Sequence, residues 1–136
     1  MRIGLCRGLV LVAALAAAGC GSSNGGGAAV NQDGPSAKQA LEDLAALLKS
    51  VGEENKPPPA RLSDLESHEG VFLSATLGIQ RKEIVYQWGT SLSGGSGIVA
   101  YEKDTESAGG WVLTQGGDVK KMTAEEFKAA PKAAKK

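Results

Sequence analysis

The N-terminal part of the sequence restricts any folded domain to the residues that follow it. Residues 8–19 form an apolar run without a charge, and Arg2 and Arg7 precede this run. A membrane-spanning helix takes about 20 apolar residues, so the run is too short to cross a bilayer. It has the length and the basic flank of a signal-peptide core. We therefore expect residues 1–19 to be removed, with Cys20 becoming the first residue of the mature chain.

Small residues stand directly before the cysteine, in the order Ala17, Ala18, Gly19, Cys20. This arrangement resembles the lipobox of bacterial lipoproteins, in which a diacylglyceryl group is added to the thiol before the chain is cleaved. The family most often has Leu three residues before the cysteine, where this chain has Ala17. The resemblance implies cleavage between Gly19 and Cys20, with Cys20 as the lipidated residue that holds the protein at a membrane.

Cysteine usage agrees with an anchoring role. The other cysteine, Cys6, lies in the segment expected to be removed, so Cys20 has no partner for an intramolecular disulfide. An ordinary secretory signal cleaved at the same place is the alternative, and it would leave an unpaired thiol. Residues 21–23 lack the Asp that the resemblance associates with retention at an inner membrane. We therefore expect a lipid-anchored protein of the cell envelope or periplasm, attached to the outer membrane if the cell has one.

A glycine-rich segment follows the cysteine. Residues 21–34 contain one large apolar side chain, Val30, and cannot bury enough surface to offset the entropy of ordering the backbone. Neither a preceding strand nor a following Lys accompanies the glycines, which argues against a phosphate-binding loop. We expect residues 20–35 to be a lipidated cysteine with a flexible tether, and residues 36–130 to form a single small domain.

The domain is predicted to begin with a helix. Ser36 and Gln39 have the spacing of a capping box, and an apolar stripe then recurs at helical spacing until Gly52, which we expect to end the helix in a left-handed conformation. The stripe consists of Ala37, Ala40, Leu41, Leu44, Leu47, Leu48 and Val51. Such a stripe is the core-facing side of a helix or, alternatively, a face that binds a partner.

The middle of the chain is less regular. Pro57–Pro59 enforce an extended conformation and make a rigid spacer or, alternatively, a ligand for an aromatic groove. Residues 61–66 predict a short helical turn. Residues 70–80 are ambiguous between strand and helix, and the alternation of Val71, Leu73, Ala75 and Leu77 favours a strand. His68 is the only histidine, and we expect it to be exposed.

The second half predicts an antiparallel sheet of about four strands. Short β-rich runs alternate with glycine-containing turns, and Gln115–Asp118 has the composition of a tight hairpin turn. The runs cover residues 82–88, 97–101, 111–114 and 118–122. Together with the first helix they predict an α+β fold, in which the helix packs on the sheet.

A short C-terminal helix is predicted after the last strand. Thr123 and Glu126 form a second capping box, Phe127 anchors the helix on the sheet, and Pro131 stops it. Residues 131–136 are expected to form a disordered basic tail.

The same region carries a second resemblance. Tyr101-Glu-Lys, the Gly109–Gly110 pair before a strand, the glycine hairpin and Met122-Thr-Ala-Glu-Glu-Phe are similar to the C-terminal end of pilin-like bacterial proteins. The similarity spans residues 37–128 and implies a helix followed by a small sheet. Those proteins begin with a long apolar helix that assembles into filaments, whereas this chain has a lipobox. The resemblance thus implies a domain detached from filament assembly, or an accessory of that assembly.

Residue types argue against catalysis. Nucleophilic catalysis needs a base within reach of the nucleophile, and the expected mature chain keeps one His and one acylated Cys. We expect no enzyme activity, no catalytic residues, no cofactor and no metal. An alternative is calcium binding by Glu102, Asp104 and Glu106, although Lys103 lies among them. The chain has 15 basic and 15 acidic residues. Loss of Arg2 and Arg7 makes it mildly acidic, which gives no reason to expect nucleic acid as a partner.

The sequence is compatible with two non-catalytic roles for the domain. Tyr86, Trp88, Tyr101 and Trp111 are candidate contact residues for an envelope protein partner, because aromatic side chains exposed together on a sheet form a contact patch. Alternatively they are the large core residues of a domain that has few others. In the second role the chain is a structural lipoprotein whose terminal lysines touch an anionic polymer or lipid, a contact that salt would screen.

Overall fold

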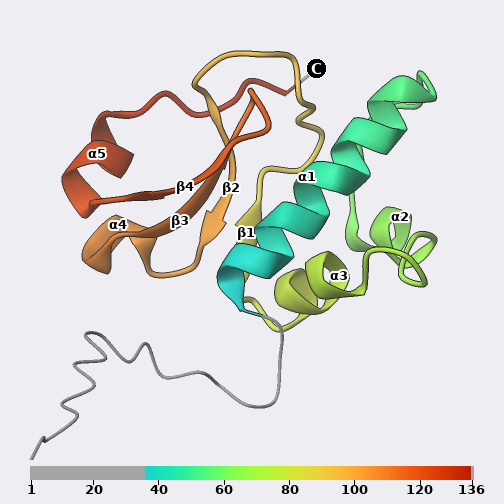
Figure 1. Cartoon of the computed structure of the whole chain (residues 1–136), viewed down its shortest axis with the longest axis horizontal. Helices are drawn as coiled ribbons and strands as arrows, with labels where there is room; N and C mark the ends of the chain where they lie inside the picture. Colours follow the sequence, from blue (N-terminus) through green and yellow to red (C-terminus); the bar gives the residue numbers. More distant parts are fainter. Residues whose placement is uncertain (1–35, 136) are drawn as a thin grey trace, which may run out of the picture.

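The computed structural model describes residues 36–135, and they form an α+β domain (Figure 1). The predicted signal peptide, the lipidation site at Cys20 and the tether lie outside the described residues. The helices are α1 (Ala37–Glu53), α2 (Leu62–Glu66), α3 (Leu73–Gln80), α4 (Thr105–Ala108) and α5 (Ala124–Ala129). The strands are β1 (Ile84–Tyr86), β2 (Ile98–Glu102), β3 (Gly110–Thr114) and β4 (Val119–Met122). The predicted fold class is confirmed.

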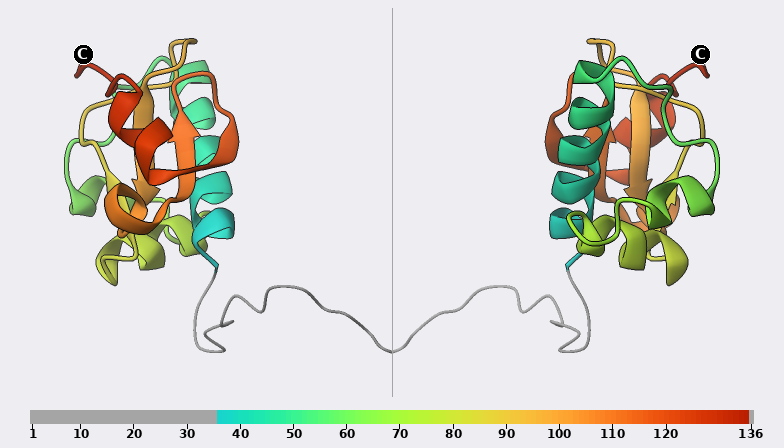
Figure 2. Two further views of the ribbon diagram at one scale, coloured as in Figure 1. Left: turned by 90° about the vertical axis from the view of Figure 1, so that its left-hand side faces the viewer. Right: turned by 90° about the vertical axis from the view of Figure 1, so that its right-hand side faces the viewer.

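The four strands form one antiparallel sheet in the order β1-β2-β3-β4, so each strand pairs with its neighbour in sequence. Helix α1 covers one face of the sheet, and α3 packs beside α1. Helices α4 and α5 lie on the other side, away from α2 and α3 (Figures 1 and 2). The domain therefore has two apolar layers, one on each face of the sheet.

The main core lies between α1 and the sheet. Leu41, Leu44 and Leu47 of the predicted stripe are completely buried there, so the stripe is core. A smaller cluster of Ile98, Val112 and Phe127 lies beneath α5. Phe127 is 1% exposed, which confirms its predicted role as the anchor of this helix.

A bulge in β2 sets the direction of its side chains. Ile98 pairs with Thr114 and Ala100 pairs with Leu113, so Val99 is an extra residue in β2. Val99 and Ala100 both belong to the main core, whereas Ile98 belongs to the cluster beneath α5. The bulge thus lets the start of β2 contribute to the second layer.

The predicted strand over residues 70–80 is wrong, because most of this segment forms α3. Val71 is 77% exposed and Leu73 is 50% exposed, so the alternating large residues do not face a core. The buried residues of α3 are instead Ala75, Thr76 and Gly78. These small side chains let α3 approach α1 closely. The alternation of apolar residues in the sequence gives no sign of this contact between the two helices.

The predicted end of the first helix at Gly52 is also wrong. Helix α1 continues to Glu53, and Asn55 adopts the left-handed conformation with φ 54°. The Asn55 N–H donates to the Gly52 carbonyl at 3.1 Å, and the Lys56 N–H donates to the Val51 carbonyl at 3.0 Å. This pair of bonds is a Schellman motif with Asn in place of the usual Gly.

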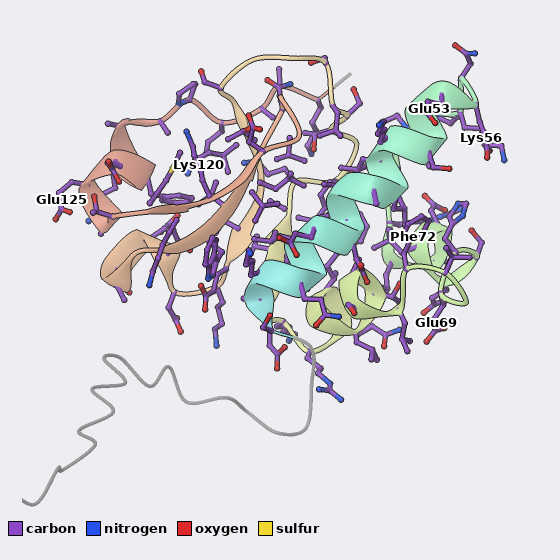
Figure 3. The ribbon with its side chains drawn as sticks, in the orientation of Figure 1. Glu53, Lys56, Glu69, Phe72, Lys120 and Glu125 are labelled. Carbon is purple, nitrogen blue, oxygen red and sulfur yellow. The ribbon has the colours of Figure 1, made fainter. Side chains whose placement is uncertain are left out.

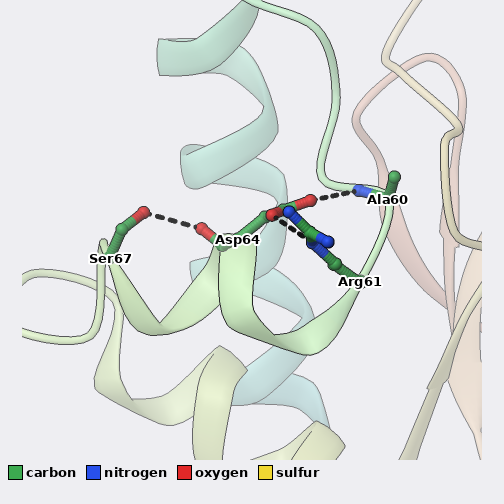
Figure 4. A network of polar contacts seen from close by, with 4 residues as sticks. All are labelled: Ala60, Arg61, Asp64 and Ser67. Atoms are coloured by element: carbon green, nitrogen blue, oxygen red, sulfur yellow. Dashed lines mark hydrogen bonds and ion pairs between the residues drawn. The ribbon is translucent and has the colours of Figure 1, made fainter.

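Helix α2 confirms the predicted helical turn and is held by Asp64 (Figure 4). The Asp64 carboxylate accepts from the Ala60 N–H at 3.0 Å and from Arg61 Nε at 3.1 Å, and the Ser67 hydroxyl donates to the Asp64 carbonyl at 2.8 Å. The Ala60 N–H and then the Arg61 side chain lower the pKa of Asp64. The network fixes α2 directly after the extended proline segment.

The C-terminal half follows the predicted order. Four residues, 115–118, connect β3 and β4 in the hairpin. The Gly117 N–H donates to the Thr114 carbonyl at 2.9 Å, and among these four residues Gly117 alone has a positive φ. The predicted capping box of α5 is confirmed: Thr123 N–H donates to Glu126 Oε2 at 2.8 Å, and Glu126 N–H donates to Thr123 Oγ1 at 3.2 Å. Helix α4 was not predicted. It lies between β2 and β3, in the acidic loop that contains Asp104 and Glu106 and begins after Glu102.

Candidate functional site at the Ile98 edge

The four candidate contact aromatics do not form one surface. Tyr86 and Trp88 lie together at the end of β1, with ring centroids 5.0 Å apart and planes at 74°. Tyr86 is 4% exposed, and its hydroxyl donates to the Thr90 carbonyl at 2.7 Å. Burial raises the pKa of Tyr86 to about 12. Tyr86 is therefore a core residue, and Trp88 packs half-buried beside it.

The other two aromatics lie on opposite faces of the sheet. Trp111 packs on the α1 side, where Lys38 Nζ is 5.5 Å from its ring centroid. Tyr101 packs beneath α5, with its ring centroid 4.7 Å from that of Phe127. The contact between Tyr101 and Phe127 could not be predicted from the sequence, because the two residues come from different predicted elements.

The chain fills a gap beside β2 with residues that follow α5. Strand β1 pairs only with residues 100–102 of β2, which leaves the backbone of Ile98 without a partner from β1. The Ile98 N–H donates to the Pro131 carbonyl at 2.8 Å, and the Ala133 N–H donates to the Ile98 carbonyl at 2.9 Å. These bonds form a parallel bridge between Ile98 and Lys132. The expectation that residues 131–136 form a free tail is wrong for Pro131–Ala133, which we call the latch segment.

Lys132 of the latch segment lies over the aromatic pair. Its Nζ is 3.1 Å from the ring centroid of Phe127 and 5.3 Å from that of Tyr101. Burial lowers the pKa of Lys132, and the negative charge of Glu106 acts in the opposite direction. Burial, together with the same Glu106 charge, raises the pKa of Tyr101. The site thus offers a cation two aromatic faces and a carboxylate.

Gly97 makes room for the latch segment. A Cβ at this position would lie 3.2 Å from the Ala133 Cα and would also collide with the Gln115 side chain. Ala133 is 7% exposed, so its methyl group is enclosed. A larger side chain at either position would push the latch segment away from β2.

Other surface features lie apart from this site. A shallow hollow of about 390 Å³ between β4 and α5 is lined in part by Lys120 and Glu126, and Figure 3 shows Lys120 and Glu125 at this end of the domain. At the opposite end, Glu69 and Phe72 lie in the connection between α2 and α3 (Figure 3), beside the exposed Val71.

The acidic loop has its own internal partners. Glu102 Oε2 accepts the Trp111 backbone N–H at 3.1 Å, and Asp104 stands at the start of α4. Among the described residues, no group of three or more His, Cys, Asp or Glu side chains is placed to hold a metal ion. His68, predicted to be exposed, is half-buried in the turn after α2.

No helix within residues 36–135 has both the length and the apolar character needed to cross a membrane. Comparisons with family models, with curated proteins and with solved structures gave no match to this chain.

Proposed function

We propose that this chain is a lipid-anchored cell-envelope protein whose domain is a non-catalytic binding or structural module. The observation that carries the proposal is the placement of Cys20, directly after an apolar run and three small residues. It is the only cysteine that remains after the proposed cleavage. Two or three acyl chains on one thiol anchor a small domain firmly, because each buried methylene contributes about 0.8 kcal/mol.

The arrangement of the domain supports a binding role at a membrane. The proposed tether joins the domain at Ser36, directly before α1, and α1 begins at the lower end of the domain in both figures (Figures 1 and 2). The residues that follow α5 lie at the upper end (Figures 1 and 2). The chain that follows α5, which includes the latch segment, therefore lies at the other end of the domain from the start of α1, where a partner in the envelope can reach it.

The test of anchoring is substitution of Cys20 with a matched cysteine control. Cys20→Ser should abolish incorporation of labelled fatty acid and move the protein from the membrane fraction to the soluble fraction. Cys6→Ser, which changes a cysteine in the segment expected to be removed, should leave both properties unchanged. A Cys20→Ser protein that stays in the membrane fraction would contradict the proposal.

A pilin-like assembly accessory is the second candidate. The observation that favours it is a long helix packed on a sequential antiparallel sheet, with a glycine hairpin near the end. For this candidate, the protein should co-sediment with sheared surface filaments even after Cys20→Ser. For a lipid-anchored module outside filament assembly, no protein should appear in the filament fraction.

A further inference from the structure

We propose that the Ile98 edge is a strand-addition site for an extended peptide segment of another envelope protein, with a cationic residue followed by a small one. The latch segment occupies this site within the same chain and must leave before the partner binds. The location of the partner in the envelope rests on the proposed function, whereas the recognition chemistry rests on the domain itself.

The backbone of the site has the hydrogen-bonding groups that strand addition requires. Ile98 presents one N–H and one carbonyl to the latch segment, at 2.8 Å and 2.9 Å from their partners. The neighbouring place along the same edge is taken by β1, since the Gln87 N–H donates to the Val99 carbonyl at 2.9 Å. Main-chain bonds of this kind supply affinity without regard to sequence. The position beside Ile98 that the latch segment occupies, which we call the slot, therefore accepts a short extended peptide that runs parallel to β2.

Side-chain chemistry then selects the peptide. The residue at the position of Lys132 lies over Phe127 and Tyr101, with the Glu106 charge acting on the same point. The next residue enters the enclosed space that Ala133 fills above Gly97. A cationic side chain followed by Ala, Gly or Ser meets both conditions. An acidic residue at the first position fails the first condition, and a large residue at the second position fails the second.

The latch segment is held by few contacts. Two backbone hydrogen bonds, one enclosed methyl group and one cation over aromatic rings attach it, while Pro131, Lys132 and Ala134 are exposed. Because it belongs to the same chain, it competes with a free peptide at a high effective concentration. Opening of the latch segment should therefore limit binding of the partner.

Hydrogen exchange on the unaltered protein tests whether the latch segment opens by itself. The Ile98 amide is bonded to the latch segment, and the Gln87 amide is bonded within the sheet. We expect the Ile98 amide to exchange at least tenfold faster than the Gln87 amide, after correction for intrinsic rates. Equal exchange of both amides through global unfolding would overturn the proposal, because the slot would then open only when the domain unfolds.

A peptide probe tests the recognition. The probe is Ala-Pro-Lys-Ala-Ala-Lys, the sequence of residues 130–135, and the protein ends after Ala130 so that the slot is empty. We expect saturable binding at the Ile98 edge, at least tenfold weaker binding to the intact chain, and at least tenfold weaker binding of a probe with Glu in place of the first Lys. A chain that ends after Ala133 keeps the latch segment and should behave like the intact chain.

A second variant keeps the test decisive if the shortened chain is unstable. Ala133→Glu in the full chain should expel the latch segment and expose the slot, with Ala134→Glu as a control of equal charge change at an exposed position. Folded Ala133→Glu protein that does not bind the probe would overturn the proposal. Dimerisation of either opened variant would also overturn it, because the occupant would then be a second copy. Neither result depends on whether Cys20 carries a lipid.

Discussion

Helix α3 meets α1 where Gly78 faces Ala40. A Cβ added at Gly78 would lie 2.9 Å from the Ala40 Cβ and 3.1 Å from Ile84 Cγ1. No real pair of side chains sits this close, so the absence of a side chain at Gly78 sets the distance between the two helices. The contact also places α3 against the start of β1.

Substitution of Gly78 should destabilise the domain. We expect Gly78→Val to lower the free energy of unfolding by about 1–3 kcal/mol, because extra carbon atoms in a packed interface force neighbours apart. Gly52 is the control, because it is also helical but has no atom within 4 Å of an added Cβ. Gly52→Ala should raise the free energy of unfolding by about 0.5–1 kcal/mol. Urea denaturation followed by tryptophan fluorescence measures both, and equal effects would contradict the packing argument.

Glycine substitutions just after the C-terminal ends of α1 and α3 should stabilise the domain. The gain should be larger where the present residue is more strained in the left-handed conformation. Asn55 and Lys82 have φ values of 54° and 59° and close equivalent Schellman motifs. Lys82→Gly should stabilise the domain by about 1 kcal/mol, because a left-handed conformation costs a side chain with a Cβ about 1–2 kcal/mol. Asn55→Gly should gain less, because Asn tolerates this conformation. Lys82→Ala keeps the Cβ and should gain nothing; thermal unfolding separates the three variants.

Stability should fall at alkaline pH through Tyr86. Burial raises the pKa of Tyr86 from 10.0 to about 12, so the folded state favours the neutral phenol. Its contribution is complete below pH 10 and is lost as the pH rises from 10 to 12, by about 2 kcal/mol. In Tyr101→Phe protein, Tyr86 is the one remaining tyrosine, and its absorbance should titrate near the upper value. A midpoint near 10 would contradict the burial argument.

The capping box of α5 should contribute measurably to stability. Thr123→Ala removes the hydroxyl that accepts the Glu126 N–H and should cost about 1 kcal/mol of unfolding free energy. Thr123→Ser keeps the acceptor and should stay close to the unaltered protein. Urea denaturation of the two variants measures the difference, and similar losses in both would assign the effect to the lost methyl group.

The sequence predicts those elements in which the pattern of residue types along the chain directly reflects which residues are buried, capped or in a turn. The leucine stripe of α1, the glycine hairpin and the Thr123 capping box are local patterns, and each appears where expected. Helix α3 could not be predicted in this way. Its buried face consists of Ala75, Thr76 and Gly78, and small side chains carry little hydrophobic signal.

The site at the Ile98 edge was beyond sequence reasoning for a different reason. The sequence predicts Lys132 to lie in a basic tail because Pro131 ends the preceding helix. Its position is fixed by Tyr101 and Phe127, which the sheet and α5 bring together from distant parts of the chain. The bulge at Val99 and the short β1 create the edge position that the latch segment fills, and neither leaves a local sequence pattern.

The sequential strand order also has a consequence for how fast the domain can assemble. Every strand pairs with the strand just before or after it, so the sheet grows by closing short loops. Short connections cost little entropy to close, so pairing of these neighbouring strands can form early in folding. A chain whose sheet closes early exposes its strand edges only briefly. Early closure of β1-β2-β3-β4 would therefore limit edge-to-edge aggregation between unfolded copies.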